Sequence, residues 1–212
     1  ALRRAFDRKW ADGEPVQMAS FLRQLGTLPH ARLVEEQLRE LRELRRLAPV
    51  AGRDHLLITN DLANLLFSSY GRKDEAIRDM EIEVHGYDQA HSGIWPHLDN
   101  GVLSSYVSLY EAVTRHAAGE AVLQKYLAKP EHDEQRKWLN DRLMALYNHA
   151  LEHNGVVSIG DSRVKLFANI VALSLQELGA APDENVRYNL VVRLATTFDI
   201  GHRHKIVGIA HQ

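Results

Sequence analysis

The sequence predicts an all-α fold, because three observations agree. Apolar residues recur at steps of four, three and four in Leu139, Leu143, Leu146 and Ala150, which places them on one face of a helix. Stretches that contain Gly, Pro and Asn separate these apolar helical segments from one another. The number of such breaks predicts about nine or ten helices. Strand signals are confined to residues 155–160, and a single short strand has no partner with which to form a sheet.

The segments between the breaks each carry a pattern of their own. In residues 33–47, Leu alternates with Glu and Arg, so Glu35 and Glu36 can both reach Arg39 on a charged outer face. The leucines repeat every three residues, whereas a coiled coil needs alternating steps of three and four, so a zipper is not expected. Two later stripes predict packed helices: Leu103, Tyr106, Val107, Tyr110 and Val113, then Phe167, Ile170, Val171, Ser174, Leu175 and Leu178.

Residues 61–77 contain a small-residue helix, a glycine and an acidic start to a second helix. Gly71 can adopt the left-handed conformation that ends a helix, and Asp74 and Glu75 lie near the positive end of the next one. This pattern resembles the middle of a tetratricopeptide repeat, which is a pair of antiparallel helices. The unit that resembles the family best spans residues 54–87.

Other features depart from the family pattern. Glu83 lies near a position that usually holds a small residue, the closing proline is absent, and no strict repeat of about 34 residues recurs. A weaker form of the same helix–glycine–helix pattern predicts that Gly201 separates two helices. The resemblance therefore implies an irregular right-handed solenoid of stacked antiparallel helix pairs, forming one domain over residues 1–212. Because the sequence starts at Ala1 rather than Met, we expect a processed chain or a piece of a longer protein.

The resemblance also implies a function, that of a scaffold whose concave groove binds a peptide or a helix of a partner protein. The candidate contacts on the first helix of the best unit are Asn60, Asn64, Phe67 and Ser68. Trp95, in a loop with an apolar centre, is a candidate binding anchor. The alternative is that Phe67 belongs to the core, that the asparagines are ordinary surface groups, and that the tryptophan plugs a helix seam.

Composition excludes several classes of protein. A formal net charge of −2 gives no global positive field, no apolar run approaches the roughly 20 residues of a membrane span, and no signal-peptide pattern opens the chain. With no cysteine, a disulfide scaffold, a thiolate nucleophile and a sulfur-ligated zinc site are excluded. Phosphate-loop, dinucleotide and calcium-loop motifs are missing. We therefore predict a soluble cytoplasmic protein that binds no cofactor.

An enzymatic alternative comes from two short blocks. Residues 159–162 resemble the Gly-Asp-Ser block of GDSL-type hydrolases, and residues 199–202 resemble their Asp-x-x-His block, which implies a triad of Ser162, Asp199 and His202. That family places its serine near the start of an α/β fold, which this sequence does not predict. The favoured interpretation is that Asp161 or Ser162 caps a helix that begins near Arg163, and catalysis is not expected.

Two further binding hypotheses depend on local clusters. His149 and His153 stand at i,i+4 on a predicted helix, a spacing that lets two imidazoles reach one metal ion, but no His-Glu-x-x-His motif accompanies them. A helical nucleic-acid-binding domain is the other alternative. Its local positive charge would come from Arg39, Arg42, Arg45 and Arg46.

Overall fold

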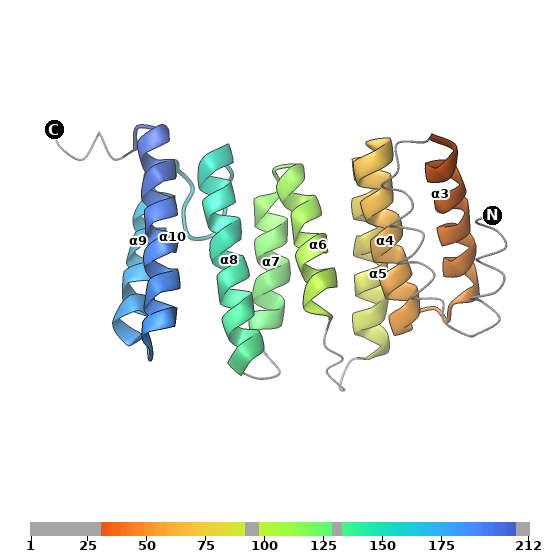
Figure 1. Cartoon of the computed structure of the whole chain (residues 1–212), viewed down its shortest axis with the longest axis horizontal. Helices are drawn as coiled ribbons and strands as arrows, with labels where there is room; N and C mark the ends of the chain where they lie inside the picture. Colours follow the sequence, from red (N-terminus) through yellow and green to blue (C-terminus); the bar gives the residue numbers. More distant parts are fainter. Residues whose placement is uncertain (1–30, 92–97, 129–132, 207–212) are drawn as a thin grey trace. The chain divides into compact units, whose positions relative to one another are not determined.

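The computed structural model describes residues 31–91, 98–128 and 133–206, and these ranges contain eight helices (Figure 1). Their bounds are α3 Ala31–Leu47, α4 Arg53–Tyr70, α5 Lys73–Ala90, α6 Asn100–Ala112, α7 His116–Leu127, α8 Asp133–His153, α9 Arg163–Ala180 and α10 Glu184–Arg203. Within the described ranges, the only β pairing is an isolated bridge between Val157 and Gly160. The predicted all-α class is therefore confirmed.

The chain divides into two compact units, residues 1–109 and 110–212, and the boundary falls within α6. Helical repeats contact mainly their neighbours in sequence, so compact units also occur inside one repeat domain. The prediction of a single domain over residues 1–212 therefore stays a prediction. Each unit is described by itself.

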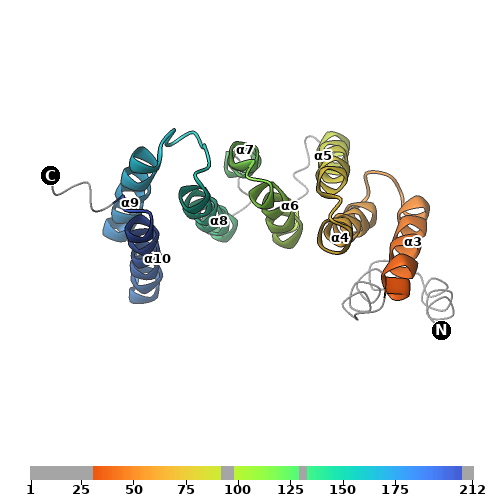
Figure 2. The same cartoon turned by 90° about the horizontal axis from the view of Figure 1, so that it is seen from above.

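In the first unit, α4 packs against both α3 and α5. The pair α4–α5 corresponds to the predicted best repeat unit, and Figure 2 shows the two helices side by side. Ala76 is fully buried, which lets the two helices approach closely. The buried apolar residues of α3 and α4 include Leu38, Leu41, Leu44, Leu56, Ile58, Leu62 and Leu66.

Gly71 ends α4 as predicted. It has φ 64° and ψ 14°, in the left-handed region, and its backbone N–H donates to the carbonyl oxygen of Leu66. The N–H of Arg72 donates to the same oxygen at 3.0 Å. These two bonds hold the turn that follows α4 against the last turn of the helix.

Gly71→Ala is expected to lower the free energy of unfolding by about 1 kcal/mol, because alanine disfavours positive φ. Gly86→Ala is the matched control, since Gly86 lies inside α5 and a Cβ added there would have no neighbouring atom within 4 Å. There, alanine has the better helix propensity and stability should rise by up to about 1 kcal/mol. Urea unfolding followed by circular dichroism measures both changes, and equal signs would contradict the assignment of the cap.

In the second unit, α7 packs on α8, α9 packs on α10, and α8 contacts both α9 and α10. Ser162 caps α9, as predicted, by accepting a hydrogen bond from the N–H of Lys165 at 3.4 Å. Asp183 caps α10 in the same way. One core cluster joins α8, α9, α10 and their connections: Met144, Tyr147, Ala150, Leu151, Val157, Leu166, Ile170, Ile200 and Ile206.

One predicted boundary is wrong. The sequence predicts that Gly201 separates two helices, but this glycine is buried inside α10, which continues to Arg203. The helix ends instead through Lys205, which has φ 56°, and the Ile206 N–H donates to the Gly201 carbonyl oxygen at 2.8 Å. The segment that follows the helix, residues 207–212, lies outside the described residues.

Candidate functional site

Two hollows follow the seam between α8 and α10 in the second unit. The larger has a volume of about 750 Å³ and is lined by the first half of α8, the α9–α10 turn and the first half of α10. The smaller, of about 370 Å³, is lined by later residues of α8 and α10. Early residues of α8 thus face early residues of α10, and later residues face later ones. The two helices therefore run in the same direction. We call the two hollows together the α8–α10 seam.

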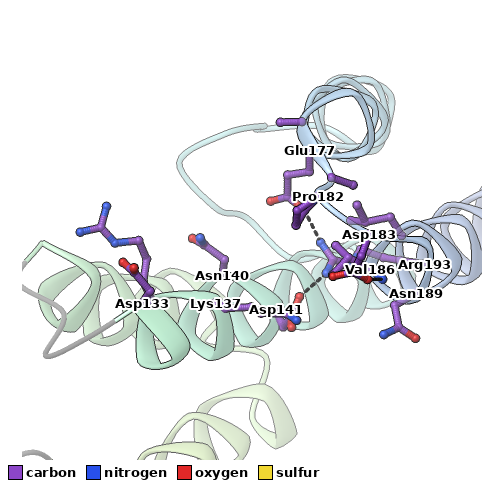
Figure 3. Close-up of a pocket in the computed structure, with 14 residues that line it drawn as sticks. Asp133, Lys137, Asn140, Asp141, Glu177, Pro182, Asp183, Val186, Asn189 and Arg193 are labelled. Atoms are coloured by element: carbon purple, nitrogen blue, oxygen red, sulfur yellow. Dashed lines mark hydrogen bonds and ion pairs between the residues drawn. The ribbon is translucent and has the colours of Figure 1, made fainter.

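Arg193 and Asp141 belong to both hollows and mark the point where they meet. The Arg193 guanidinium donates to Asp141 on α8 and, at 2.8 Å, to Glu177 on α9 (Figure 3). Only 15% of the Arg193 side chain is exposed. Because two carboxylates hold this cation, it ties three helices together and fixes the shape of the seam.

Other side chains of the larger hollow have unused hydrogen-bonding capacity. Arg136, Lys137 and Asn140 on α8 and Asn189 on α10 make no side-chain hydrogen bond or ion pair with the described part of the chain. Figure 3 shows Asn140 and Asn189 on the two helices that border the hollow. The same hollow has apolar lining from Ala180, Ala181, Pro182, Val186 and Leu190. Such a mixture of apolar lining and a few polar groups is typical of ligand sites in proteins.

Polar contacts also join the two helices next to the smaller hollow. The Thr197 hydroxyl donates to Asn148 Oδ1 at 2.9 Å in a buried position. Arg203 donates to Glu152 at 2.6 Å, and its hydrogen bond is the main cause that lowers the pKa of the Glu152 carboxyl. A similar bond joins Ser105 on α6 to Asn64 on α4 in the first unit, also at 2.9 Å. In each unit, an Asn side chain thus ties two helices together.

The predicted contact residues on α4 are only partly available to a partner. Asn60 is buried at 8% exposure, and Asn64 uses its Oδ1 to accept from Ser105. Ser68 is exposed and donates to the Asn64 carbonyl, while Phe67 is half-buried beneath the Lys73 ammonium. Trp95 lies outside the described residues. The α4 contacts therefore stay predictions.

The seam was missed from the sequence, although a weak signal exists. Asn140 and Asn189 lie inside helices, where asparagine is a poor helix former and makes no local bond in this structure. Residues that break a local rule without a structural reason are candidates for function. Neither residue belongs to a recognisable motif, so the signal was visible only once α8 and α10 were known to be neighbours.

The predicted histidine pair is part of a larger cluster that includes His116 on α7. The rings of His149 and His153 stack with centroids 4.1 Å apart, and His149 Nδ1 lies 2.8 Å from His116 Nε2. One nitrogen of His149 is thus already engaged. Among the described residues, no group of three or more His, Asp or Glu side chains is arranged to hold a metal ion. Metal binding by the pair stays a hypothesis.

Two of the three residues of the hydrolase alternative have other partners. Ser162 caps α9, and the Asp199 carboxylate accepts from Arg203 at 3.0 Å. His202 is exposed near the end of α10. Among the described residues, no hydrogen bond joins any two members of this set, so the contacts that would activate a serine are not formed.

The four arginines of the nucleic-acid alternative all lie near carboxylates. Arg39 lies 3.6 Å from Glu36, and Arg46 lies 2.8 Å from Glu43 on the same helix. The other two pairs join α3 to α5: Arg42 with Glu75 at 3.6 Å, and Arg45 with Asp79 at 3.1 Å. These pairings reduce the local positive field that phosphate binding requires.

Comparison with known proteins places the fold. A solved structure described as a kinesin light chain with nearly identical TPR-like repeats, from Podosopora anserina, matches 93% of this chain and 90% of its own, with a TM-score of 0.54 and 17% identity. The chain has a tetratricopeptide-like helical-repeat fold. No protein-family model matches it, and no curated protein does so. The predicted resemblance is confirmed at the level of the fold.

The described helices of this tetratricopeptide-like chain are not suited to a bilayer. Among the described residues, none combines the length with the apolar character that a membrane span requires.

Proposed function

We propose that the chain is a protein-interaction module that binds an extended segment of a partner protein in the α8–α10 seam. The observation that carries this proposal is the larger hollow, where apolar side chains lie beside cationic and amide groups that have no partner among the described residues. The tetratricopeptide-like fold supports it, because helical repeats provide extended binding surfaces.

The amide groups suit a peptide main chain. Each asparagine side chain offers two N–H donors and one carbonyl acceptor, which match the carbonyl and N–H of a peptide backbone. Asn140 and Asn189 come from different helices, so together they can hold a segment that lies between them. The ion pairs of Arg193 fix the walls in advance, which reduces the entropy lost on binding.

The test starts from a phage-displayed library of random 12-residue peptides selected on the 212-residue chain. Synthetic copies of the enriched peptides are then titrated against the unmodified chain and against Asn140→Ala/Asn189→Ala by fluorescence anisotropy. Loss of two amide hydrogen-bonding groups, at about 0.5 to 1.5 kcal/mol each, should weaken binding roughly tenfold. Asn185→Ala is the matched control, because Asn185 is exposed on α10 and does not line the seam.

Two results would count against the seam. Peptides that bind the double variant as tightly as the unmodified chain would exclude Asn140 and Asn189 as contacts. If those peptides instead lose affinity for Phe67→Ala, the predicted α4 surface is the site. Failure to enrich any peptide over an unrelated helical protein would contradict peptide binding by either surface.

A further inference from the structure

The pair α9–α10 carries a concentration of exposed apolar side chains. Of the large apolar residues that are exposed in the described ranges, most lie on these two helices: Val164, Leu173, Leu175, Tyr188, Val191, Val192 and Phe198, with exposed fractions between 38% and 68%. The remainder are scattered singly over other elements. Single exposed apolar residues are ordinary on a protein surface, whereas a cluster of this kind marks an interaction site.

The composition of α9 also indicates an apolar surface that is not fully buried. No charged residue occurs between Leu166 and Gln176, yet only Leu166, Ile170 and Ser174 are buried in this helix. A helix that is apolar on nearly all sides is expected to be covered on more than one face. Its contacts with α8 and α10 therefore leave one apolar side that no other described element covers.

The uncovered side has the spacing of a helix-packing surface. Val164, Ala168, Val171 and Leu175 follow each other at steps of four, three and four, and of these only Val171 is partly buried. On α10, Tyr188, Val191, Ala195 and Phe198 form a comparable stripe. Phe167 and Phe198 meet edge to face with centroids 5.4 Å apart, so the two stripes join into one surface. We call it the α9–α10 face.

Small and large side chains alternate along this face, which makes it suited to pack against itself. When two copies of α9 lie antiparallel and are centred near Val171, Ala168 of each copy comes opposite Leu175 of the other. Ala195 likewise lies at the middle of the α10 stripe, between larger residues on either side. Pairing of small with large side chains fills space well, and a two-fold contact uses the same patch on both subunits.

Several charged residues near the face pair within the chain. Lys165 pairs with Asp161 at 3.0 Å, and Arg203 pairs with Asp199 at 3.0 Å and with Glu152 at 2.6 Å. Each of these cations is already matched by a carboxylate of the same chain. These pairs leave no cation unmatched, and the face itself is apolar.

The size of the face fits a dimer. Without Leu173, which lies on the opposite side of α9, six large side chains at about half exposure provide roughly 500 Å² of apolar surface, against about 800 Å² per partner in an interface of standard size. Polar atoms at the border supply the remainder. We propose that the α9–α10 face is the interface of a two-fold symmetric dimer of this chain. This inference does not depend on peptide binding in the α8–α10 seam.

Sedimentation velocity on the 212-residue chain between 1 and 100 µM tests the proposal. We expect a monomer–dimer equilibrium, and Leu175→Glu/Val191→Glu should raise the dimer dissociation constant at least a hundredfold. Both residues are about half exposed, so the variant should keep its fold, which circular dichroism verifies. Ile82→Glu is the matched control, because Ile82 is 65% exposed on α5 and should leave the equilibrium unchanged.

A second measurement reports on the location of the contact. The chain has no cysteine, so an Ala195→Cys variant can carry a single nitroxide label. Electron–electron resonance should show a distance between two labels that disappears when Leu175→Glu/Val191→Glu is added. A chain that stays monomeric at 100 µM would overturn the proposal. A dimer that survives the two charge substitutions would also overturn it, because another surface would then hold the copies together.

Discussion

Replacing Glu120 with alanine is expected to lower the free energy of unfolding of the second unit by about 3 kcal/mol, because the carboxylate is a buried hydrogen-bonding centre. Glu120 is 3% exposed. It accepts from the Tyr147 hydroxyl at 2.7 Å, from the Ser158 N–H at 2.6 Å, from the Ser158 hydroxyl and from the Gln124 amide at 3.2 Å. Its loss would leave several donors without an acceptor in a buried region.

The protonation of Tyr147 supports the role of Glu120 as a hydrogen-bond acceptor. Burial is the main cause that raises the pKa of the Tyr147 hydroxyl, and its hydrogen bond to Glu120 raises the pKa further. The phenol therefore stays protonated and remains a donor at neutral pH. Because Ser158 belongs to the α8–α9 connection, Glu120 also holds that connection against α7.

Urea unfolding of Glu120→Ala, Tyr147→Phe and the double variant measures the contribution and its coupling. The coupling energy between the two sites should reach about 1 kcal/mol or more. Glu134→Ala is the control, because Glu134 is exposed in the first turn of α8 and should cost less than about 1 kcal/mol. Amide exchange at Ser158 should become faster in Glu120→Ala. Unchanged exchange at that amide would contradict the role assigned to the carboxylate.

The fold was more accessible from the sequence than the site, for reasons visible in particular residues. The stripe from Leu139 to Ala150 and the glycine at position 71 depend on residues close in sequence. Helix periodicity and backbone conformation are therefore enough to predict the helix and its end. Ser162 is recognisable as a cap because capping acts within three residues. Gly201 is misread because the left-handed residue that ends α10 is Lys205, a residue type that sequence patterns do not associate with a helix end.

The α8–α10 seam depends instead on contacts between distant parts of the chain. Arg193 meets Asp141 across 52 positions, and Thr197 meets Asn148 across 49. The four arginines of α3 show the same limit, since two of their acidic partners, Glu75 and Asp79, lie on α5. Spacing within one helix predicts which residues share a face. It does not predict which residue of another helix faces them.

Lowering the pH below about 6.5 is expected to destabilise the second unit through His116 and His149. His116 is fully buried at the first position of α7, and its Nε2 lies 2.8 Å from His149 Nδ1. Burial is the main cause that lowers the pKa of each of the two imidazoles, and further positive charge on neighbouring histidines lowers it more. The positive end of α7 also opposes protonation of His116.

The groups around the cluster do not remove this penalty. Glu111 favours protonation of both imidazoles, but its carboxylate is engaged by Arg142 at 2.7 Å. Glu152 also favours protonation of His149, and it pairs with Arg203. Gly155 lies so close that a Cβ at its position would be 2.2 Å from His116 Nδ1. There is accordingly little room for the ring to move towards water when it becomes charged.

The sign of the effect follows from proton linkage. The pKa values in the folded state lie below the value of about 6.5 for an unfolded chain, so the unfolded state binds more protons as the pH falls. The contribution to stability is therefore fully present above a pH of about 6.5. It decreases as the pH falls through the folded-state pKa values, by at most about 1.4 kcal/mol per pH unit for each histidine.

Urea unfolding at closely spaced pH values from 7.5 to 5.0 measures this slope. We expect the slope below a pH of about 6.5 to correspond to uptake of about one to two protons on unfolding, and to become much flatter in His116→Gln/His149→Gln. His202→Gln is the control, because that histidine is exposed on α10 and should leave the slope unchanged. A slope that persists in the double variant would assign the acid sensitivity to other groups. A slope that disappears with it would show that the contact between α7 and α8 depends on two neutral imidazoles.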